Sequence, residues 1–213
     1  IEMLQTQRIK NPEDLSLIQE LASCFYLSSR YNEFDSFFET VLEQAENSAL
    51  LCSLKAHVCT LQRNFDVALN WYEKAFSLQS DEGTHLLNIA STLKIKNQSK
   101  DAIEKLLQAC QLFLDKKDWQ NFVQTSTDLE KEKLSSIQKR QLASLKGKFY
   151  WYQNQIEKAK EQLEIYATGK TSEQKDHQAI FMLSTIYKEE NNLENALEYC
   201  EKAIKLDETD SLY

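Results

Sequence analysis

The chain has 213 residues with three glycines and one proline, and 33 acidic against 25 basic side chains give it a formal net charge of −8. Such a charge disfavours nucleic acid as the main partner, because phosphate contacts need a basic footprint. Scarce glycine and proline are typical of an all-helical protein, and no apolar run is as long as a membrane span. Because the chain opens on Ile1 instead of methionine, we expect a fragment of a longer protein or a trimmed one.

Helical periodicity and end signals together predict about eleven helices. Asn11 as a cap, Pro12 at the first helical position and Glu13 in the first turn predict a helix start near the N-terminus. Further along, Gly169 suits a helix end, and the Thr171–Gln174 stretch offers a capping box before the last pair of helices. We expect helices at 12–30, 33–46, 48–62, 65–79, 83–97, 99–115, 118–131, 135–153, 155–168, 172–190 and 193–207.

A small residue is followed twelve positions later by an alanine at four places. A large side chain or a cysteine stands three positions after each small residue, and another stands four positions after each alanine. Residues three or four apart share one face of a helix, so each unit has one stripe around its small residue and another around its alanine. The small residues lie where two helices approach closely. The pairs are Ala56 and Ala68, Ala90 and Ala102, Gly147 and Ala159, and Ser184 and Ala196.

The repeated units resemble the tetratricopeptide repeat, a helix–turn–helix unit of about 34 residues. The best match is Leu183-Ser184-x-x-Tyr187 followed by Ala196-x-x-x-Cys200-x-x-Ala203, and the unit at 49–80 carries Ala56, Cys59, Phe65, Ala68, Tyr72 and Ala75. A weaker unit upstream reads Phe25-x-x-Ser28 and Phe37-x-x-x-Val41, with phenylalanine in both small positions. The resemblance covers residues 13–210 and implies an all-α, right-handed α-α superhelix, a solenoid whose units stack on their neighbours.

The repeat is irregular in its middle, where the small positions step by 57 residues from Ala90 to Gly147. The frame recovers if Cys110 serves as an extra small position, followed by Phe113 and then Phe122. Helix 99–115 would then be shared, as the second helix of one unit and the first of the next. This hypothesis divides the chain into residues 1–115 and 99–213. The alternative is a degenerate repeat with a long loop at 130–136.

Catalytic and metal-binding patterns are missing from the sequence. Its five cysteines have no Cys-x-x-Cys spacing, which argues against structural zinc and against a disulfide framework. An odd number of thiols on apolar stripes favours a reducing compartment, so we expect the cytoplasm, with the nucleus as the other option. The three histidines have no nucleophile or carboxylate at a telling spacing, and phosphate-loop motifs do not occur. We therefore expect no enzyme activity, no cofactor and no metal site.

The family resemblance implies that the first helix of each unit lines a concave groove that binds a partner. In this groove Trp151 and Lys148 share one helix, and Phe181 and Met182 stand on the next first helix. We expect them to form a pocket with an apolar floor and a cationic edge, for an extended segment with a bulky residue near an acid. Carried onto this chain, the groove residues are His57, Asn88, Lys94, Gln108, Gln111, Lys148, Trp151, Tyr152, Phe181, Met182, Thr185 and Lys188.

Two functions are compatible with such a groove. The first is a non-catalytic scaffold that binds another protein or an extended peptide. The alternative is a peptide-sensing solenoid that regulates an effector domain, an enzyme or a DNA-binding module, outside these residues.

Lysines between Lys131 and Lys148, next to Phe149 and Trp151, could bind single-stranded nucleic acid. Solvated lysines beside a core aromatic explain them better, since the chain as a whole is acidic. The sequence identifies neither the partner nor the oligomeric state.

Overall fold

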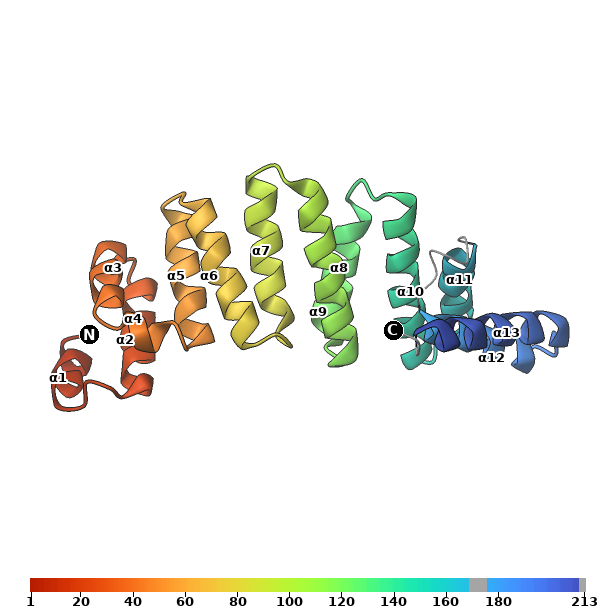
Figure 1. The fold of residues 1–213 in the computed structure, drawn as a ribbon, viewed down its shortest axis with the longest axis horizontal. Coiled ribbons are helices and arrows are strands. Elements are labelled where there is room, and N and C mark those ends of the chain that lie inside the picture. Colours follow the sequence, from red (N-terminus) through yellow and green to blue (C-terminus); the bar gives the residue numbers. More distant parts are fainter. Residues whose placement is uncertain (169–175, 211–213) are drawn as a thin grey trace. The chain divides into compact units, whose positions relative to one another are not determined.

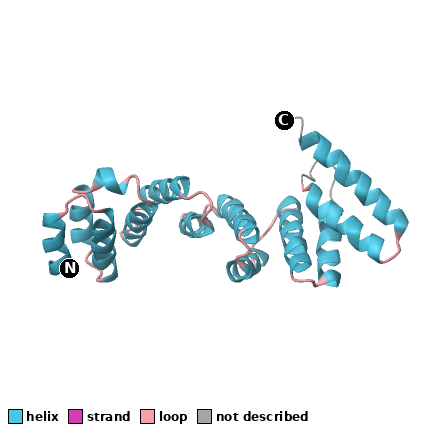
Figure 2. Cartoon of the chain, turned by 90° about the horizontal axis from the view of Figure 1, so that it is seen from below, coloured by secondary structure: helices cyan, strands magenta, loops and turns pink. Residues whose placement is uncertain are grey.

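A computed structural model describes residues 1–168 and 176–210, and within these ranges the chain is helix and connecting loop without a strand (Figures 1 and 2). It divides into two compact units, residues 1–112 and 113–213. The helices are α1 (Glu2–Lys10), α2 (Leu15–Leu27), α3 (Tyr31–Glu39), α4 (Leu42–Ala45), α5 (Ala49–Leu61), α6 (Phe65–Leu78), α7 (Gly83–Ile95), α8 (Ser99–Asp115), α9 (Trp119–Glu130), α10 (Ser136–Tyr152), α11 (Ile156–Ala167), α12 (His177–Glu189) and α13 (Leu193–Asp210).

The N-terminal helices differ from the prediction. Helix α1 was not expected, and Asn11 is its C-terminal cap, so the predicted helix start at Asn11 and Pro12 is wrong. Helix α2 begins at Leu15, because the Asp14 carboxylate accepts hydrogen bonds from the backbone N–H groups of residues 16 and 17. The expected helix 33–46 is split into α3 and α4. The predicted signals at Gly169 and Thr171–Gln174 lie outside the described residues, and α12 is capped by Asp176.

One turn recurs in each helical pair and sets the repeat frame. Its central residue is left-handed, with φ near +60°, and the next N–H donates to the carbonyl five residues earlier, as in the Schellman motif. The left-handed residues are Ser29, Arg63, Asn97, Lys117, Asn154 and Asn191. Their spacings are 34, 34, 20, 37 and 37 residues, so the short step falls between Asn97 and Lys117, directly before and after α8.

The positions of these turns correct the alignment of the first unit and concern the helix that we expected to be shared. Each predicted small residue lies seven positions before its left-handed residue, which makes Ala22, and not Phe25, the small residue of the first unit. Ala22 is fully buried.

Helix α8 lies between two of these turns, the one at Asn97 and the one at Lys117. Leu106 and Cys110 on this helix are buried. This arrangement supports our proposal that α8 belongs to two helical pairs.

The small residues lie where the frame places them. Ala68, Ala102 and Ala159 are fully buried, whereas Ala196 on α13 is half-buried. A Cβ atom on Gly147 would lie 2.6 Å from Cδ2 of Leu163, a distance too short for van der Waals contact. Helices α10 and α11 therefore approach each other closely at Gly147, where a larger residue would collide with Leu163.

All five cysteines are free thiols. Cys52, Cys59 and Cys110 are buried, while Cys24 and Cys200 are half-buried. Burial raises the pKa of the Cys52 thiol to about 11 and that of Cys110 to about 12. Among the described residues no helix is both long and apolar enough to cross a membrane, and no group of His, Cys, Asp or Glu side chains in that part could hold a metal ion.

Candidate functional site

The structure distributes the predicted groove residues over both units. His57, Asn88, Lys94, Gln108 and Gln111 belong to the first unit, and the remaining seven belong to the second. The second unit holds the larger of these two groups of groove residues. Here Phe181, Tyr152 and Lys188 are exposed, Trp151, Met182 and Thr185 are half-buried, and Lys148 is buried.

A buried polar network holds the helices of the second unit together around Asp176, the N-cap of α12. Its carboxylate pairs with the Lys148 ammonium at 2.7 Å and accepts hydrogen bonds from the Ser144 hydroxyl and from the backbone N–H of Ala179. Its own N–H donates to the Tyr166 hydroxyl, 2.8 Å away. Three helices, α10, α11 and α12, thus meet at one residue, Asp176.

The charge state of Asp176 follows from these contacts. Burial alone would raise the pKa of this carboxyl group. The Lys148 charge and the hydrogen bonds from Lys148, Ser144 and Ala179 outweigh burial, so the pKa is lowered. The carboxylate is therefore ionised at neutral pH, and it satisfies both a buried cation and the start of a helix.

Lys148 does not form the exposed cationic edge that we expected. It is 6 % exposed, and its ammonium group is taken up by Asp176. The expectation rested on the position of Lys148 beside Trp151 on one helix, and it missed Asp176, which lies 28 residues further on. An aspartate just before an apolar helix is a common cap signal, so the cap could have been predicted, although its contact with Lys148 could not.

One face of α12 carries an exposed aromatic ring, Phe181, and an exposed cation, Lys188. Phe181, Thr185 and Lys188 follow one another at i, i+4 and i+7, which places them on the same side of the helix. The Phe181 ring is 56 % exposed, unusual for phenylalanine, and the Thr185 hydroxyl donates to the Phe181 carbonyl at 3.1 Å. Lys188 stands about 10 Å along the helix axis from Phe181, at 1.5 Å per residue.

Helix α10 packs against α12 and contributes an aromatic side chain beside the core of this unit. Trp151 of α10 and Met182 of α12 both lie, half-buried, against the same core cluster of the second unit, which includes Ile180 and Leu183. Phe181, Met182 and Trp151 therefore supply apolar surface on two adjoining helices, and Lys188 supplies a cation. We call these four residues the α10–α12 surface.

Tyr152 belongs to another neighbourhood. Its ring lies 6.1 Å from that of Trp119 on α9, and Trp119 in turn lies 5.7 Å from Phe149. These rings join α9 to α10, together with the stacked pair of Phe122 and Phe149. We therefore assign Tyr152 to the packing of α9 on α10.

His57 in the first unit is engaged in packing. Its Nδ1 atom is joined to the Tyr72 hydroxyl by a hydrogen bond of 2.8 Å, and its ring lies 5.9 Å from that of Tyr26. Burial, and then the charge of the nearby His85, lower the pKa of His57. A neutral, half-buried imidazole bonded to a tyrosine links α5 to α6 and offers little to a ligand.

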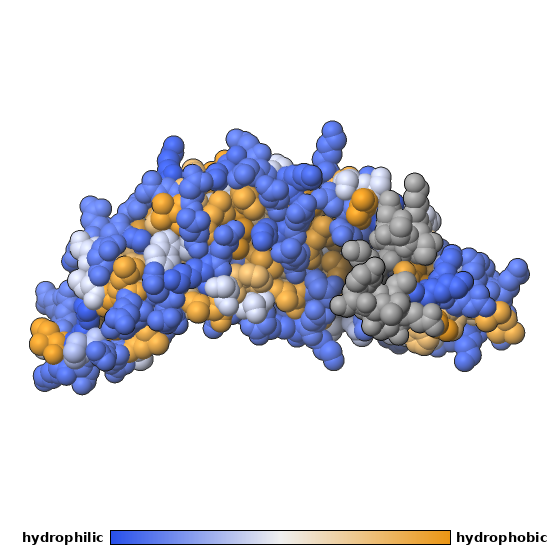
Figure 3. Space-filling model, viewed as in Figure 1, coloured by the Kyte–Doolittle hydropathy of each residue, from blue (hydrophilic) through white to orange (hydrophobic). Residues whose placement is uncertain are grey.

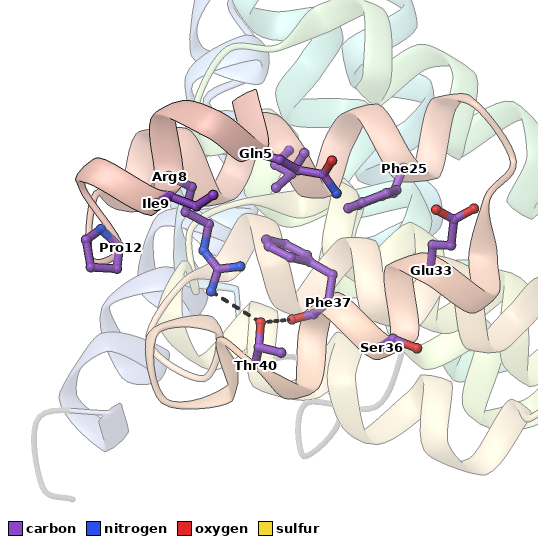
Figure 4. A pocket seen from close by; sticks show the side chains of 10 residues that line it. Gln5, Arg8, Ile9, Pro12, Phe25, Glu33, Ser36, Phe37 and Thr40 are labelled. Carbon is purple, nitrogen blue, oxygen red and sulfur yellow. Dashed lines mark hydrogen bonds between the residues drawn. The ribbon is translucent and has the colours of Figure 1, made fainter. Parts of the chain in front are cut away.

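The first unit also has a pocket of about 660 Å³ between α1, α2 and α3, which none of the predicted residues lines (Figure 4). Leu21, Phe25 and Phe37 supply its apolar wall. Arg8 reaches from α1 to α3, where it donates to the Thr40 hydroxyl at 3.2 Å and lies over the Phe37 ring. No periodic apolar stripe marks α1, so this pocket was not expected.

Antiparallel helical pairs with one turn at a fixed place in each pair define a helical repeat protein. The tetratricopeptide repeat model matches residues 177–210, which hold α12 and α13. A TPR repeat-containing protein of Treponema pallidum (strain Nichols) is 24 % identical over 147 residues, which cover 67 % of this chain and 17 % of that protein. The residues of α12 and α13 thus match a tetratricopeptide repeat, and the chain is similar to a protein that contains such repeats.

Solved structures with similar folds include YrrB, described as a TPR protein with an unusual peptide-binding site. It is 17 % identical, with 95 % of this chain and 91 % of that chain covered and a TM-score of 0.48. PilF of Pseudomonas aeruginosa is 14 % identical over 95 % of this chain and 99 % of its own, with a TM-score of 0.43.

Proposed function

We propose that this chain is a non-catalytic interaction scaffold, and that its second unit binds an extended segment of a partner protein across the α10–α12 surface. The observation that carries the proposal is the Phe181 ring, 56 % exposed on a helix whose first turn is held by the Asp176 network. An aromatic side chain displayed on a rigid helix can bind a partner with little loss of conformational entropy.

The spacing on α12 specifies the segment. An extended strand advances about 3.3 Å per residue, so the roughly 10 Å between Phe181 and Lys188 equals about three residues. We therefore propose a partner segment with a bulky apolar residue and an acidic residue three positions apart. Its apolar side chain would contact Phe181, Met182 and Trp151, while its carboxylate would pair with Lys188. The remaining groove residues stay predictions, and those of the first unit would belong to a separate contact.

A linear peptide library displayed on phage and panned against the full chain tests this proposal. We expect enrichment of peptides with the two residues three apart, and we expect Phe181→Ala to weaken their binding at least about tenfold, the size of a hot-spot effect. Lys188→Ala should act mainly on the association rate and the salt dependence. Glu198→Ala on α13 is the control. Peptides without the spacing, or equal affinities for Phe181→Ala and Glu198→Ala, would contradict the proposal.

The alternative function is regulation of an effector domain by these repeats. The Treponema pallidum relative supports it only in that the matched region is 17 % of a much longer protein. Under this alternative the same surface would bind a regulatory peptide. Peptide binding to the isolated chain is expected in both cases, and an activity that changes with peptide in the full-length protein would favour the second.

A further inference from the structure

Helix α13 has an apolar stripe that the described residues of its unit leave largely uncovered. Leu193, Leu197, Cys200 and Ile204 recur at i, i+4, i+7 and i+11, so they lie on one side of the helix. Leu193, Leu197 and Ile204 are 67 %, 62 % and 53 % exposed. A different side of α13 packs on α12 through Ala203 and Tyr199. In Figure 3 hydrophobic side chains lie among hydrophilic ones where α12 and α13 are seen.

The other second helices of the repeat show what occupies this stripe. Ala68 of α6 is equivalent to Ala196 of α13. The same offsets from Ala68 give the equivalent stripe on α6, and all four of its residues are buried or half-buried: Phe65, Leu69, Tyr72 and Phe76. Helix α7, the first helix of the following pair, packs against α6. Helix α12 packs against α11 in the same way. The stripe on the second helix of a pair is thus the face on which the first helix of the next pair packs.

A charge contact accompanies this packing at two junctions, α6 with α7 and α11 with α12. Lys96, the C-cap of α7, pairs with Asp66 in the first turn of α6. Glu190, the C-cap of α12, pairs with Lys160 of α11 at 2.6 Å. The residue that ends the incoming helix therefore meets a charge of opposite sign near the start of the helix on which it docks.

On α13 the charge at this place is negative. Glu194 stands two residues before Ala196, as Asp66 stands two before Ala68, and Glu201 lies beside the same edge of the stripe. In the part of the chain that the structure describes, neither glutamate has an ion-pair partner, while Glu198 pairs with Lys202 at 2.8 Å. By analogy with Lys96 and Asp66, the incoming helix would end in a lysine or arginine.

We infer that the α13 stripe is a docking face for an amphipathic helix of a partner protein, with an apolar stripe of its own and a lysine or arginine at its C-terminal end. A second copy of this chain fits less well. Two α13 stripes face to face would bring Glu194 and Glu201 against their counterparts, and like charges in contact oppose association. This surface is separate from the α10–α12 surface and does not depend on the function proposed for it.

The chain itself supplies a probe. A synthetic, fluorescein-labelled peptide of residues 83–98 contains α7 and Lys96, and its binding to the full chain can be followed by fluorescence anisotropy. We expect saturable binding that Leu197→Asp weakens at least about tenfold, because the substitution places a charge in the apolar contact. Val123→Asp, at an exposed apolar position of α9, is the matched control. Because Leu197 is exposed, its replacement should leave the melting curve unchanged.

A charge exchange tests whether the docked helix ends in a basic residue that pairs with Glu194. Glu194→Lys should weaken binding of the probe about three- to tenfold, and a Lys96→Glu probe should bind the Glu194→Lys chain better than the unchanged chain. Anisotropy that stays flat, or equal affinities for Leu197→Asp and Val123→Asp, would overturn the inference. A dimer in sedimentation velocity that Leu197→Asp dissociates would also overturn it, because the occupant would then be a second copy. Phe181→Ala should leave probe binding intact.

Discussion

The Asp176 carboxylate lies 2.7 Å from the Lys148 ammonium and thereby joins the middle of α10 to the start of α12. The lysine is almost completely buried, and among the described residues Asp176 is the acidic group with which it pairs. A cation in such a place stabilises the fold only while its partner is ionised. The position of Phe181 on α12 therefore depends on a contact made at the start of that helix.

Replacing Asp176 with asparagine should destabilise the second unit. The change leaves the buried Lys148 charge unpaired, and we expect the free energy of unfolding to fall by about 2–4 kcal/mol. Urea denaturation at pH 7 measures this. In the double variant Lys148→Met with Asp176→Asn the buried charge is gone, and part of the loss should be recovered. A single variant as stable as the parent would show that the pair contributes nothing.

The same pair predicts a loss of stability in acid. The pKa of Asp176 is lower in the folded chain than its usual value of about 3.9, so its contribution is complete above pH 4 and is lost as the pH falls through the folded pKa. The difference in unfolding free energy between parent and Asp176→Asn should therefore shrink below about pH 4. A difference independent of pH between 3 and 7 would argue against an ionised Asp176 in the folded state.

His85 should make the first unit sensitive to mild acid. It is buried, and within the described chain neither ring nitrogen has a hydrogen-bond partner. Burial lowers its pKa, although Glu82 raises it somewhat. The unfolded chain then binds a proton below about pH 6.5 that the folded chain does not, so stability falls as the pH drops through this range.

Replacing His85 with leucine should remove this dependence. We expect a gain of about 1 kcal/mol at pH 7, because an unpaired polar ring is exchanged for an apolar side chain, and a larger gain at pH 5. Thermal melts at the two pH values provide the comparison. The neighbouring His57, whose pKa is also lowered, keeps a smaller dependence in the variant. A lower melting temperature at both pH values would mean that the ring nitrogens are satisfied.

The left-handed turns should tolerate glycine better than the residues present. Lys117 has φ of +58°, a conformation that costs a side-chain-bearing residue about 1 kcal/mol. Lys117→Gly should therefore raise the unfolding free energy by roughly 0.5–1 kcal/mol. Lys116→Gly, one residue earlier and not left-handed, is the control and should destabilise. The two variants changing stability in the same direction would show that the turn is not the cause.

Gly147→Ala should destabilise the contact between α10 and α11. Alanine favours a helix over glycine by about 1 kcal/mol, but its Cβ would overlap the side chain of the fully buried Leu163, at a cost of about 1–3 kcal/mol. We expect a net loss of roughly 1 kcal/mol in chemical denaturation. In a Leu163→Ala background the overlap is gone, and the same change should become neutral or stabilising.

The helices from α5 to α11 could be predicted from the sequence within one or two residues, because their apolar stripes are strong and their turns recur. Helix α1 could not, since Leu4 is its only buried residue and no stripe marks it. The start of α2 was misplaced because Asn11 and Pro12 fit a turn between helices as well as a helix start. The first unit was misaligned because Phe25, three residues after Ala22, repeats the family pattern out of phase.

The candidate site was harder to predict than the fold. Helical spacing correctly placed Phe181 and Lys188 at exposed positions of α12, since exposure there follows from a single helix. Lys148 was misjudged because its burial depends on Asp176, in another helix and beyond a loop. Spacing within one helix cannot report such a contact between helices.

The unequal burial of the cysteines has a practical consequence. A maleimide reacts with the thiolate, so at neutral pH the buried Cys52, Cys59 and Cys110, with their raised pKa values, should stay unlabelled. Cys24 and Cys200 are more accessible, and one belongs to each unit. The unaltered chain therefore carries a natural pair of attachment points for a donor and an acceptor dye, with which the separation of its two units can be followed in solution as a partner is added.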